Sequence, residues 1–547
     1  MLDKFNPHMI QDIEGARHAI VLLMNLVEEL KQENIAQRAE IQRLRDENNR
    51  LKGEQGKPDI KPSNRRSQDH SSEKERRGED KPKKRQKRKK VGEVKIDRDE
   101  IVEIDKAQLP EDAEFKGYEI AIVQDLRIET DNIRFQKEKY YSASEQQTYI
   151  AALPKGYGGQ FGPTIRALVV SLYYAAGMSE PKIIELLEQM GVNISKGKVS
   201  ALLTKETKSW EEEADAIVIA GLKSSSWQHL DDTGTRVNGV NGYCHILCNP
   251  FYTAYATRPK KDRLTVIAVL QNSEKAIFLF NQQTPEWLAK FEIPLWVQKQ
   301  IAAWPQGVWL SEAEVGDLLA GRLSERLNQQ QQARIYEAGA LTAYYAQDKY
   351  PVIPILVSDE APQFRHLTEK QMLCWIHEGR HYKKLQPHMG YHQEILDSVL
   401  KQFWVYYHRL QAYRVAPDPE TAVALRLEFK TIFSQTTDYE QLNQRLAKTL
   451  AHEEKLLVVL DHPEIPLHNN PAELGARQRV RKRDVSFGPR TEDGKVAWDS
   501  FMTVAETAKK LGVSFYQYVL DRVSQKNAMS SLADIIRSHG HPTLVAP

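Results

Sequence analysis

Cysteine is scarce in this chain: its 547 residues include three, Cys244, Cys248 and Cys374. So few, in an odd number, argue against a disulfide scaffold and exclude a four-cysteine zinc module, and we expect all three in the core. No apolar run approaches the roughly 18 residues that span a bilayer, and the first residues, MLDKFNPHMI, lack a signal-peptide pattern. These absences predict a cytoplasmic protein in a reducing compartment, without a membrane partner.

Net charge is also almost absent, because 76 lysines and arginines stand against 74 aspartates and glutamates. Hydrophobic residues make up 41% of the chain, which is enough for a sizeable core, and the length predicts several domains. The charges are unevenly distributed along the chain, so individual segments say more about function than the sum does.

Residues 14–53 follow a heptad pattern. Two series at steps of seven occupy its apolar seam: Ile20, Val27, Asn34, Ile41 and Asn48 at a, and Leu23, Leu30, Gln37, Leu44 and Leu51 at d. Asparagine at a positions fixes register and favours two parallel strands. We therefore predict a coiled coil that forms a homodimer or a higher oligomer. The alternative is an amphipathic helix docked on its own chain.

Residues 54–94 contain almost nothing apolar, so we expect a disordered linker. Within it, 81–90 (KPKKRQKRKK) holds eight cations in ten residues, which indicates an arm that binds DNA phosphates. The alternatives are a solvated charge run or an intramolecular partner for the acidic stretch 97–114. The residues expected to contact DNA are Lys83, Lys84, Arg85, Lys87 and Arg88.

A strand-like alternation over 117–142 predicts a small β module at 95–150. The pattern then becomes helical, with one helix expected at 163–177 and a second at 180–190.

Ser195 is placed to cap a third helix, which carries Lys196 and Lys198. Two helices, a short turn and a basic helix predict a helix-turn-helix module over 151–215, with both lysines near a DNA major groove. Three packed helices without a DNA role are the alternative.

Three carboxylates stand out by position. Asp231 ends the strand candidate WQHLD, Asp359 ends PILVSD, and Glu473 lies in the first turn of a helix at HNNPAEL. Acids at the ends of core strands converge at a cleft, where three of them can hold two divalent ions for attack on a phosphodiester. Mg²⁺, or Mn²⁺, suits such an oxygen-rich site.

These acids have alternative interpretations. Asp231 and Asp359 could be turn residues, and their neighbours Asp232 and Glu360 are the alternatives in register. Glu473 could be a capping-box partner for an N-cap at Asn470.

A competing motif is HEGRH, from His377 to His381, which matches the H-E-x-x-H pattern of zinc peptidases. Gly379 inside the motif weakens a helix, and Pro387 and Gly390 interrupt it before the next histidines. We therefore rank the peptidase low and expect no zinc.

A strongly basic segment follows Glu473. It is either a solvated helix face or a DNA-binding surface beside the acids. The residues expected to contact DNA are Arg477, Arg479, Arg481, Lys482 and Arg483.

In order along the chain, the motifs are GVNISKGKVSALL, HLDDTGTRV, LVSDEAPQF, CWIHEGR, HNNPAEL and RKRDVSF. Together with the N-terminal heptads, they resemble the DDE transposases of the insertion-sequence sixty-six family, the TnpC type, over about residues 15–525. The resemblance implies an RNase H-like core that cleaves and joins DNA strands, with Asp231, Asp359 and Glu473 as catalytic acids on two Mg²⁺ ions. The implied partners are double-stranded DNA, as transposon ends and target, and a second copy of the chain, with accessory transposition proteins as candidates.

Two departures from this family are visible. Its usual cysteine-paired zinc module has no cysteines here over 95–150, and the insertion at 284–345 is long. A catalytically idle or domesticated DNA-binding protein is the second hypothesis, and Mg²⁺-dependent nicking distinguishes it from a transposase.

The expected fold class is multidomain α+β, with a coiled coil, a helix-turn-helix module and an RNase H-like α/β core interrupted by helical insertions. The expected domains are 14–53 (coiled coil), 54–94 (linker), 95–150 (β module), 151–215 (helix-turn-helix), 216–280 (first core segment), 281–345 (insertion), 346–385 (second core segment), 386–465 (insertion), 466–527 (third core segment, with Glu473) and 528–547 (tail).

Overall fold

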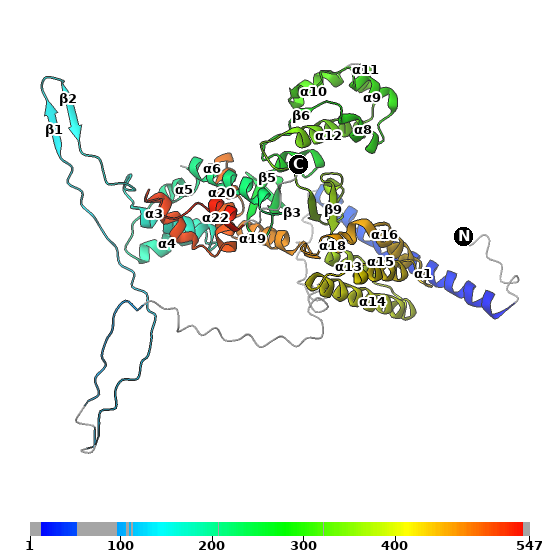
Figure 1. Cartoon of the computed structure of the whole chain (residues 1–547), viewed down its shortest axis with the longest axis horizontal. Helices are drawn as coiled ribbons and strands as arrows, with labels where there is room; N and C mark the ends of the chain where they lie inside the picture. The colour runs from blue at the N-terminus through cyan, green and yellow to red at the C-terminus, as the bar shows by residue number, and fades with distance from the viewer. Residues whose placement is uncertain are drawn as a thin grey trace.

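The structure is a computed structural model that describes residues 12–51, 96–105, 109–110, 113–205, 207–320 and 322–539 (Figure 1). Among these residues, no helix combines the length and the apolarity needed to cross a membrane. The residues of the predicted basic arm (Lys83, Lys84, Arg85, Lys87 and Arg88) lie outside the described residues.

A five-stranded sheet forms the centre of the fold, in the order β5-β4-β3-β8-β9. The first three strands are antiparallel neighbours joined by short turns, while β8 and β9 run parallel to β3. This mixed sheet is consistent with the expected RNase H-like core. The strands are β3 (Trp227–Val237), β4 (Val240–Cys248), β5 (Thr253–Arg258), β8 (Ile355–Ser358) and β9 (Lys370–Leu373).

Helices from distant segments of the sequence cover this sheet. α19 packs on β3 and β4, and α20 packs on β5 and on α6. All three cysteines are free and buried in this core, as predicted. The helices on the sheet are α6 (Lys208–Lys223), α19 (Asn470–Ser486) and α20 (Glu492–Lys510). Beyond them, α22 (Leu532–His539) packs on α6, α21 (Phe515–Val523) packs on α3 (Pro163–Tyr174), and α7 (Arg263–Leu270) packs on α12 (Gln329–Ala346).

The two predicted insertions are helical and lie on different sides of the sheet (Figure 1). The first contains α8 (Thr284–Lys290), α9 (Leu295–Ile301), α10 (Glu312–Leu319), α11 (Arg322–Arg326) and α12 (Gln329–Ala346), with a small ribbon of β6 (Phe278–Leu279) and β7 (Trp309–Leu310). The second contains α14 (Gly390–Val415), α15 (Pro419–Phe433), α16 (Glu440–Ala451), α17 (Glu453–Leu456) and α18 (Val458–Asp461).

No strand is predicted from the sequence at 370–373, where the structure has β9. β9 is short and lies at the edge of the sheet, paired to β8 on one side. α13 (Trp375–Lys383) follows it directly and leads into the second insertion.

Three short helices precede the core, at the positions expected for the helix-turn-helix module. α3 (Pro163–Tyr174), α4 (Glu180–Gln189) and α5 (Lys196–Thr204) pack against one another. Ser195 caps α5 as predicted, since its hydroxyl accepts a hydrogen bond from the Lys198 backbone N–H at 3.2 Å. Lys196 is exposed and Lys198 is half-buried at the start of α5.

The predicted β module is reduced to one hairpin. Only β1 (Lys139–Ser142) and β2 (Gln147–Ile150) are strands, and the described residues between 96 and 138 form no regular structure. Their apolar side chains, such as Ile120 and Val123, are exposed, so they have no packed layer to support a sheet. The strand expected over 117–142 is therefore wrong except at its end.

Residues 13–51 form the predicted long helix, α1 (Ile13–Leu51). Its heptad seam is exposed: Ile20, Leu30 and Leu44 keep about half of their surface accessible. The opposite side of its first half contacts the second helical insertion through Asn25 and Gln32. α1 therefore does dock on its own chain, but through a face other than its heptad seam.

Candidate active site

Asp231 and Asp359 lie on neighbouring parallel strands. β3 and β8 pair with Trp227 opposite Ile355 and His229 opposite Val357. Two residues further along both strands, the same register places Asp231 opposite Asp359, on the same face of the sheet. Adjacent strands are about 4.8 Å apart, so the two carboxylates are neighbours. Asp359 directly follows β8 as predicted, whereas Asp231 lies inside β3, which continues to Val237.

Asn469 fixes the start of α19 on β3. Its side chain is buried, donates to the Leu230 carbonyl at 2.9 Å and accepts the Nδ1–H of His229 at 3.0 Å. Burial lowers the pKa of His229 to about 3, so this ring is neutral. The backbone N–H of Asn469 also points to the Cys374 sulfur at 3.2 Å.

Glu473 lies four residues after Asn469 and therefore on the same face of α19, above Asp231. Gly475 lets the helix approach this closely, because a Cβ there would lie 2.8 Å from Ile246 of β4. The structure thus brings Asp231, Asp359 and Glu473 from three distant segments close enough for the charges of Asp359 and Glu473 to act on Asp231.

The negative charges of these acids repel one another, and this repulsion favours the protonated form of Asp231. Burial and then the nearby negative charges of Asp359, Asp232 and Glu473 together raise the pKa of Asp231 to about 7, against a lowering by the Asp232 backbone N–H. Mutual repulsion among buried carboxylates is what a bound divalent cation relieves, and oxygen donors are those that Mg²⁺ and Mn²⁺ take. The residues present therefore fit such ions.

α13 supplies contacts to Glu473 that the sequence interpretation missed. Arg380 Nη2 lies 3.3 Å from Glu473 Oε2, and His377 Nδ1 lies 3.8 Å from Oε1. Arg380 also contacts His377 Nε2 at 3.1 Å. The spacing of three residues between His377 and Arg380 was the available signal, since it places both on one helix face.

The capping-box interpretation of Glu473 is wrong. The helix begins one residue earlier than expected, with Asn469 as N-cap, and no side chain forms a capping bond there. The Glu473 carboxylate turns instead toward α13, while the Asn469 side chain bonds to β3.

The alternative acids point elsewhere. Asp232 accepts a hydrogen bond from Gln363 at 2.8 Å and lies 3.7 Å from Lys261. Glu360 faces a separate cavity, where it lies 3.6 Å from His452 and 3.7 Å from Arg365.

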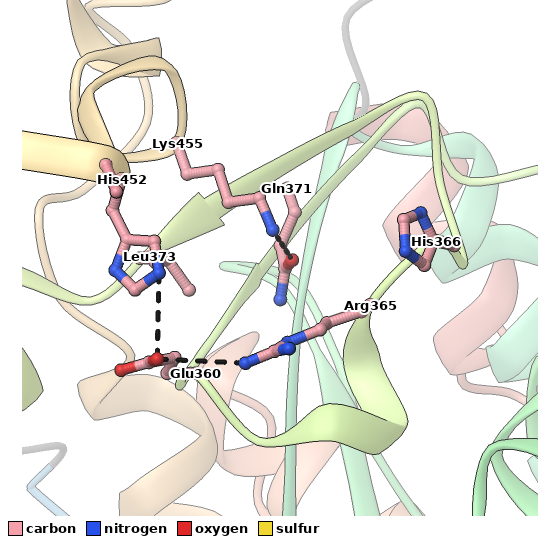
Figure 2. Close-up of a pocket in the computed structure, with 8 residues that line it drawn as sticks. Glu360, Arg365, His366, Gln371, Leu373, His452 and Lys455 are labelled. Carbon is pink, nitrogen blue, oxygen red and sulfur yellow. Dashed lines mark hydrogen bonds and ion pairs between the residues drawn. The ribbon is translucent and has the colours of Figure 1, made fainter. Parts of the chain in front are cut away.

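This cavity, of about 260 Å³, lies between the edge of the sheet and the second insertion (Figure 2). Lys455 reaches into it and donates to Gln371 at 3.1 Å, and Gln371 in turn donates to Ser358, next to Asp359. Burial, and then the charge of Arg365, hold the pKa of Lys455 below its usual value. The cavity therefore holds two cations, Arg365 and Lys455, and Lys455 is linked through Gln371 to Ser358, the neighbour of Asp359.

The two histidines of the HEGRH motif face different partners and do not converge as the H-E-x-x-H pattern requires. Glu378 is buried on α13 and forms an ion pair with Arg445, while His377 faces Glu473 and His381 faces Glu360 at 4.0 Å. Gly379 is needed for packing, because a Cβ there would lie 2.9 Å from Trp404 of α14. Residues of the motif thus contact α14 and α16 and hold α13 against the second insertion.

The basic residues of α19 divide into two groups. Arg477 and Arg481 are exposed, and Arg483 is half-buried with its guanidinium on the Gly234 carbonyl. Arg479 and Lys482 are buried, which corrects their prediction as DNA contacts.

Each buried cation has partners within the core. Arg479 lies 3.3 Å from Asp499 and over the Trp498 ring, and Lys482 lies over the Tyr173 ring. Burial lowers the pKa of Lys482 to about 6.

Residues 158–279 and 327–497 match the family described as Transposase IS66 family, which covers more than half of the chain. The chain belongs to the IS66 family of transposases. The match includes all three acids and is interrupted over 280–326, within the first helical insertion.

A protein of Sinorhizobium fredii (strain NBRC 101917 / NGR234), described as uncharacterized protein y4jO, is 31% identical over 319 residues, which are 58% of this chain and 98% of that protein. As an IS66-family member, the chain is a DDE-type transposase by family, and DNA is the partner that this family implies.

Proposed function

We propose that this protein is the transposase of an insertion sequence, which binds the element ends and catalyses metal-dependent strand cleavage and strand transfer with Asp231, Asp359 and Glu473. The observation that carries the proposal is the convergence of these acids from β3, β8 and α19 at one place beside the sheet. The three acids are far apart in the sequence, so a fold that brings them together is best explained by a ligand that all three bind.

Asp231, Asp359 and Glu473 would hold two Mg²⁺ or Mn²⁺ ions. Bound ions of this kind supply an activated oxygen nucleophile and stabilise the leaving oxygen. Asn469 and His229 keep Glu473 at a fixed position over β3. Arg380 orients the Glu473 carboxylate, and its charge offsets some of the repulsion among the acids.

Several basic surfaces support DNA binding. Lys196 and Lys198 lie at the start of α5, where a recognition helix meets bases and phosphates. Arg477, Arg481 and Arg483 follow Glu473 along α19 and would hold phosphates near the site. The basic arm (Lys83, Lys84, Arg85, Lys87 and Arg88) would add affinity that does not depend on sequence.

The cavity of Figure 2 would take a phosphate of the DNA strand next to the scissile position. Arg365 and Lys455 are its cations, and Glu360, which lies 3.7 Å from Arg365, is its carboxylate. Two cations beside one paired carboxylate leave a positive cavity close to Asp359, which suits a phosphodiester oxygen.

Lys455→Gln combined with Arg365→Gln is therefore expected to weaken binding of end DNA and to lower the slope of log affinity against log salt by about 0.9 for each phosphate that the protein no longer neutralises. Fluorescence anisotropy over a salt series measures both quantities. Lys448→Gln is the matched control, because Lys448 is an exposed cation of α16 outside the cavity. Equal slopes for the double variant and the wild type would contradict phosphate binding here.

The proposed function is tested by incubating the purified full-length protein with DNA that carries the element's flanking ends. We expect nicked and strand-transfer products with Mg²⁺ or Mn²⁺ and none with EDTA. Binding to the ends without any metal-dependent product would instead favour the second hypothesis, a DNA-binding protein without catalysis. Sequencing gels of end-labelled DNA distinguish these outcomes.

A second copy of the chain is the proposed partner in this reaction. The exposed a and d residues of α1 form a regular seam along the helix, and the asparagines at a favour two parallel strands. Pairing through this seam would bring two active sites to the two ends of one element.

A further inference from the structure

α1 is held on the catalytic region of its own chain by polar contacts. Asn25 donates to the Asp438 carbonyl at 2.9 Å and accepts from the Glu440 backbone N–H at 2.9 Å. Gln32 and Gln441 join their side-chain amides at 2.9 Å. These contacts lie at the start of α16, within the second insertion.

A buried carboxylate and a buried histidine lie next to each other at the centre of this contact. Glu28 of α1 is 1% exposed and His392 of α14 is fully buried, with Glu28 Oε2 3.4 Å from His392 Nδ1. The other oxygen of Glu28 accepts the backbone N–H of His388. The His392 ring stacks on Tyr439, with ring centroids 4.5 Å apart. A buried carboxylate strongly favours the position that provides these partners, because an unpaired buried charge is costly.

The docked face and the heptad seam are different faces of α1. With Ile20 and Val27 at a, Glu28 occupies a b position, and Asn25 and Gln32 occupy f positions. These positions lie on the back of a coiled-coil helix, away from a and d. An amphipathic helix that packed on its own chain through hydrophobic burial would have hidden its apolar seam instead.

We propose that α1 is a two-faced connector: its b and f positions dock on α14 and α16 of its own chain, and its a and d seam pairs with α1 of a second copy. The coiled coil would then do more than tether two protomers. Because each α1 is docked on its own insertion, pairing would hold the two catalytic domains in one fixed arrangement, as coordinated cleavage of two DNA ends requires. This inference rests on the proposed self-association and function.

Docking is tested without DNA by Gln32→Cys with Gln441→Cys and a short bis-maleimide cross-linker. The native cysteines are buried and do not compete. We expect a cross-link within one chain, seen as altered mobility of the monomer band on a denaturing gel. Leu30→Cys with Gln441→Cys is the control, because Leu30 lies on the seam face. A cross-link between chains would overturn docking on the same chain, and no cross-link above the control would overturn docking altogether.

The seam is tested by Leu30→Cys alone. A parallel, in-register pair places the two d positions opposite each other, so oxidation is expected to give a covalent dimer. Glu29→Cys, at the outer c position, is expected to remain monomeric on the same gel. If Leu30→Cys gave no covalent dimer, the proposal that a second copy occupies the seam would be wrong, whatever the cross-link between positions 32 and 441 shows.

The coupling is tested by Asn25→Ala with Gln32→Ala, which removes docking hydrogen bonds and leaves the seam intact. Light scattering is expected to show an unchanged mass. Nicking of a single DNA end should persist, while the product cleaved at both ends should be lost. Wild-type yields of the two-end product would overturn the coupling. Absence of single-end nicking in the wild type as well would instead contradict the proposed function itself.

Discussion

Glu473→Gln is expected to abolish metal-dependent cleavage of end DNA and to leave metal-free binding to that DNA intact or slightly stronger. A carboxamide is a poor ligand for a hard divalent cation, and it carries no charge to repel a phosphate. Gln keeps the length of the side chain and an oxygen that can accept from Arg380, so the packing of α13 against α19 is preserved. Cleavage is measured on end-labelled DNA with Mg²⁺, and binding by anisotropy in EDTA.

Two variants sharpen this test. Asp231→Asn removes a charge from β3 and should give the same loss of cleavage with the same retention of binding. Glu464→Gln is the control, because Glu464 is a partly exposed acid that pairs with His462 outside the cluster. If Glu473→Gln cleaved at the wild-type rate, Glu473 would not be a ligand, and Glu360 would be the next acid to replace.

Local reasoning could single out the three proposed acids, because each has a local marker in the sequence. Asp359 follows an apolar run, and Glu473 follows a helix-start pattern. The exact start of that helix was beyond local reasoning: Asn469 and Asn470 are equally good caps by residue type. The choice depends on His229 and Leu230, which are far away in the chain and bind the Asn469 side chain.

β3 illustrates a different limit. Apolar residues end at Leu230, so the strand was expected to end at Asp231, but pairing with β4 extends it by six residues. The signal was present in Asn238-Gly239, which has positive φ at both positions and forms the tight turn of a hairpin. β9 and the missing strand at 117–138 could not be predicted in this way. Whether such a segment forms a strand depends on whether another strand or a packed layer lies beside it.

The basic residues of α19 could have been separated by their spacing. Arg479 and Lys482 are three residues apart and share a helix face, while Arg477 and Arg481 are four apart and share another. Periodicity thus identifies two faces, but it does not say which of them is covered. The covering helix is α20, which brings Asp499 and Trp498 from the next segment of the chain.

Arg479→Ala is therefore expected to lower the free energy of unfolding by about 3–5 kcal/mol, because it leaves the largely buried Asp499 without its ion-pair partner. The substitution also removes the guanidinium's hydrogen bond to Thr257 at 2.7 Å and its stacking on the Trp498 ring. Thermal and urea unfolding followed by tryptophan fluorescence measure the change.

Arg481→Ala is the matched control for Arg479→Ala, since Arg481 is exposed on the same helix and should change stability by less than about 0.5 kcal/mol while weakening DNA binding. Arg479→Ala combined with Asp499→Ala should recover some of the lost stability, because no buried charge then remains unpaired. If Arg479→Ala unfolded like the wild type and lost DNA affinity as Arg481→Ala does, then Arg479 would reach DNA through a rearrangement of α20, and its assignment to the core would be wrong.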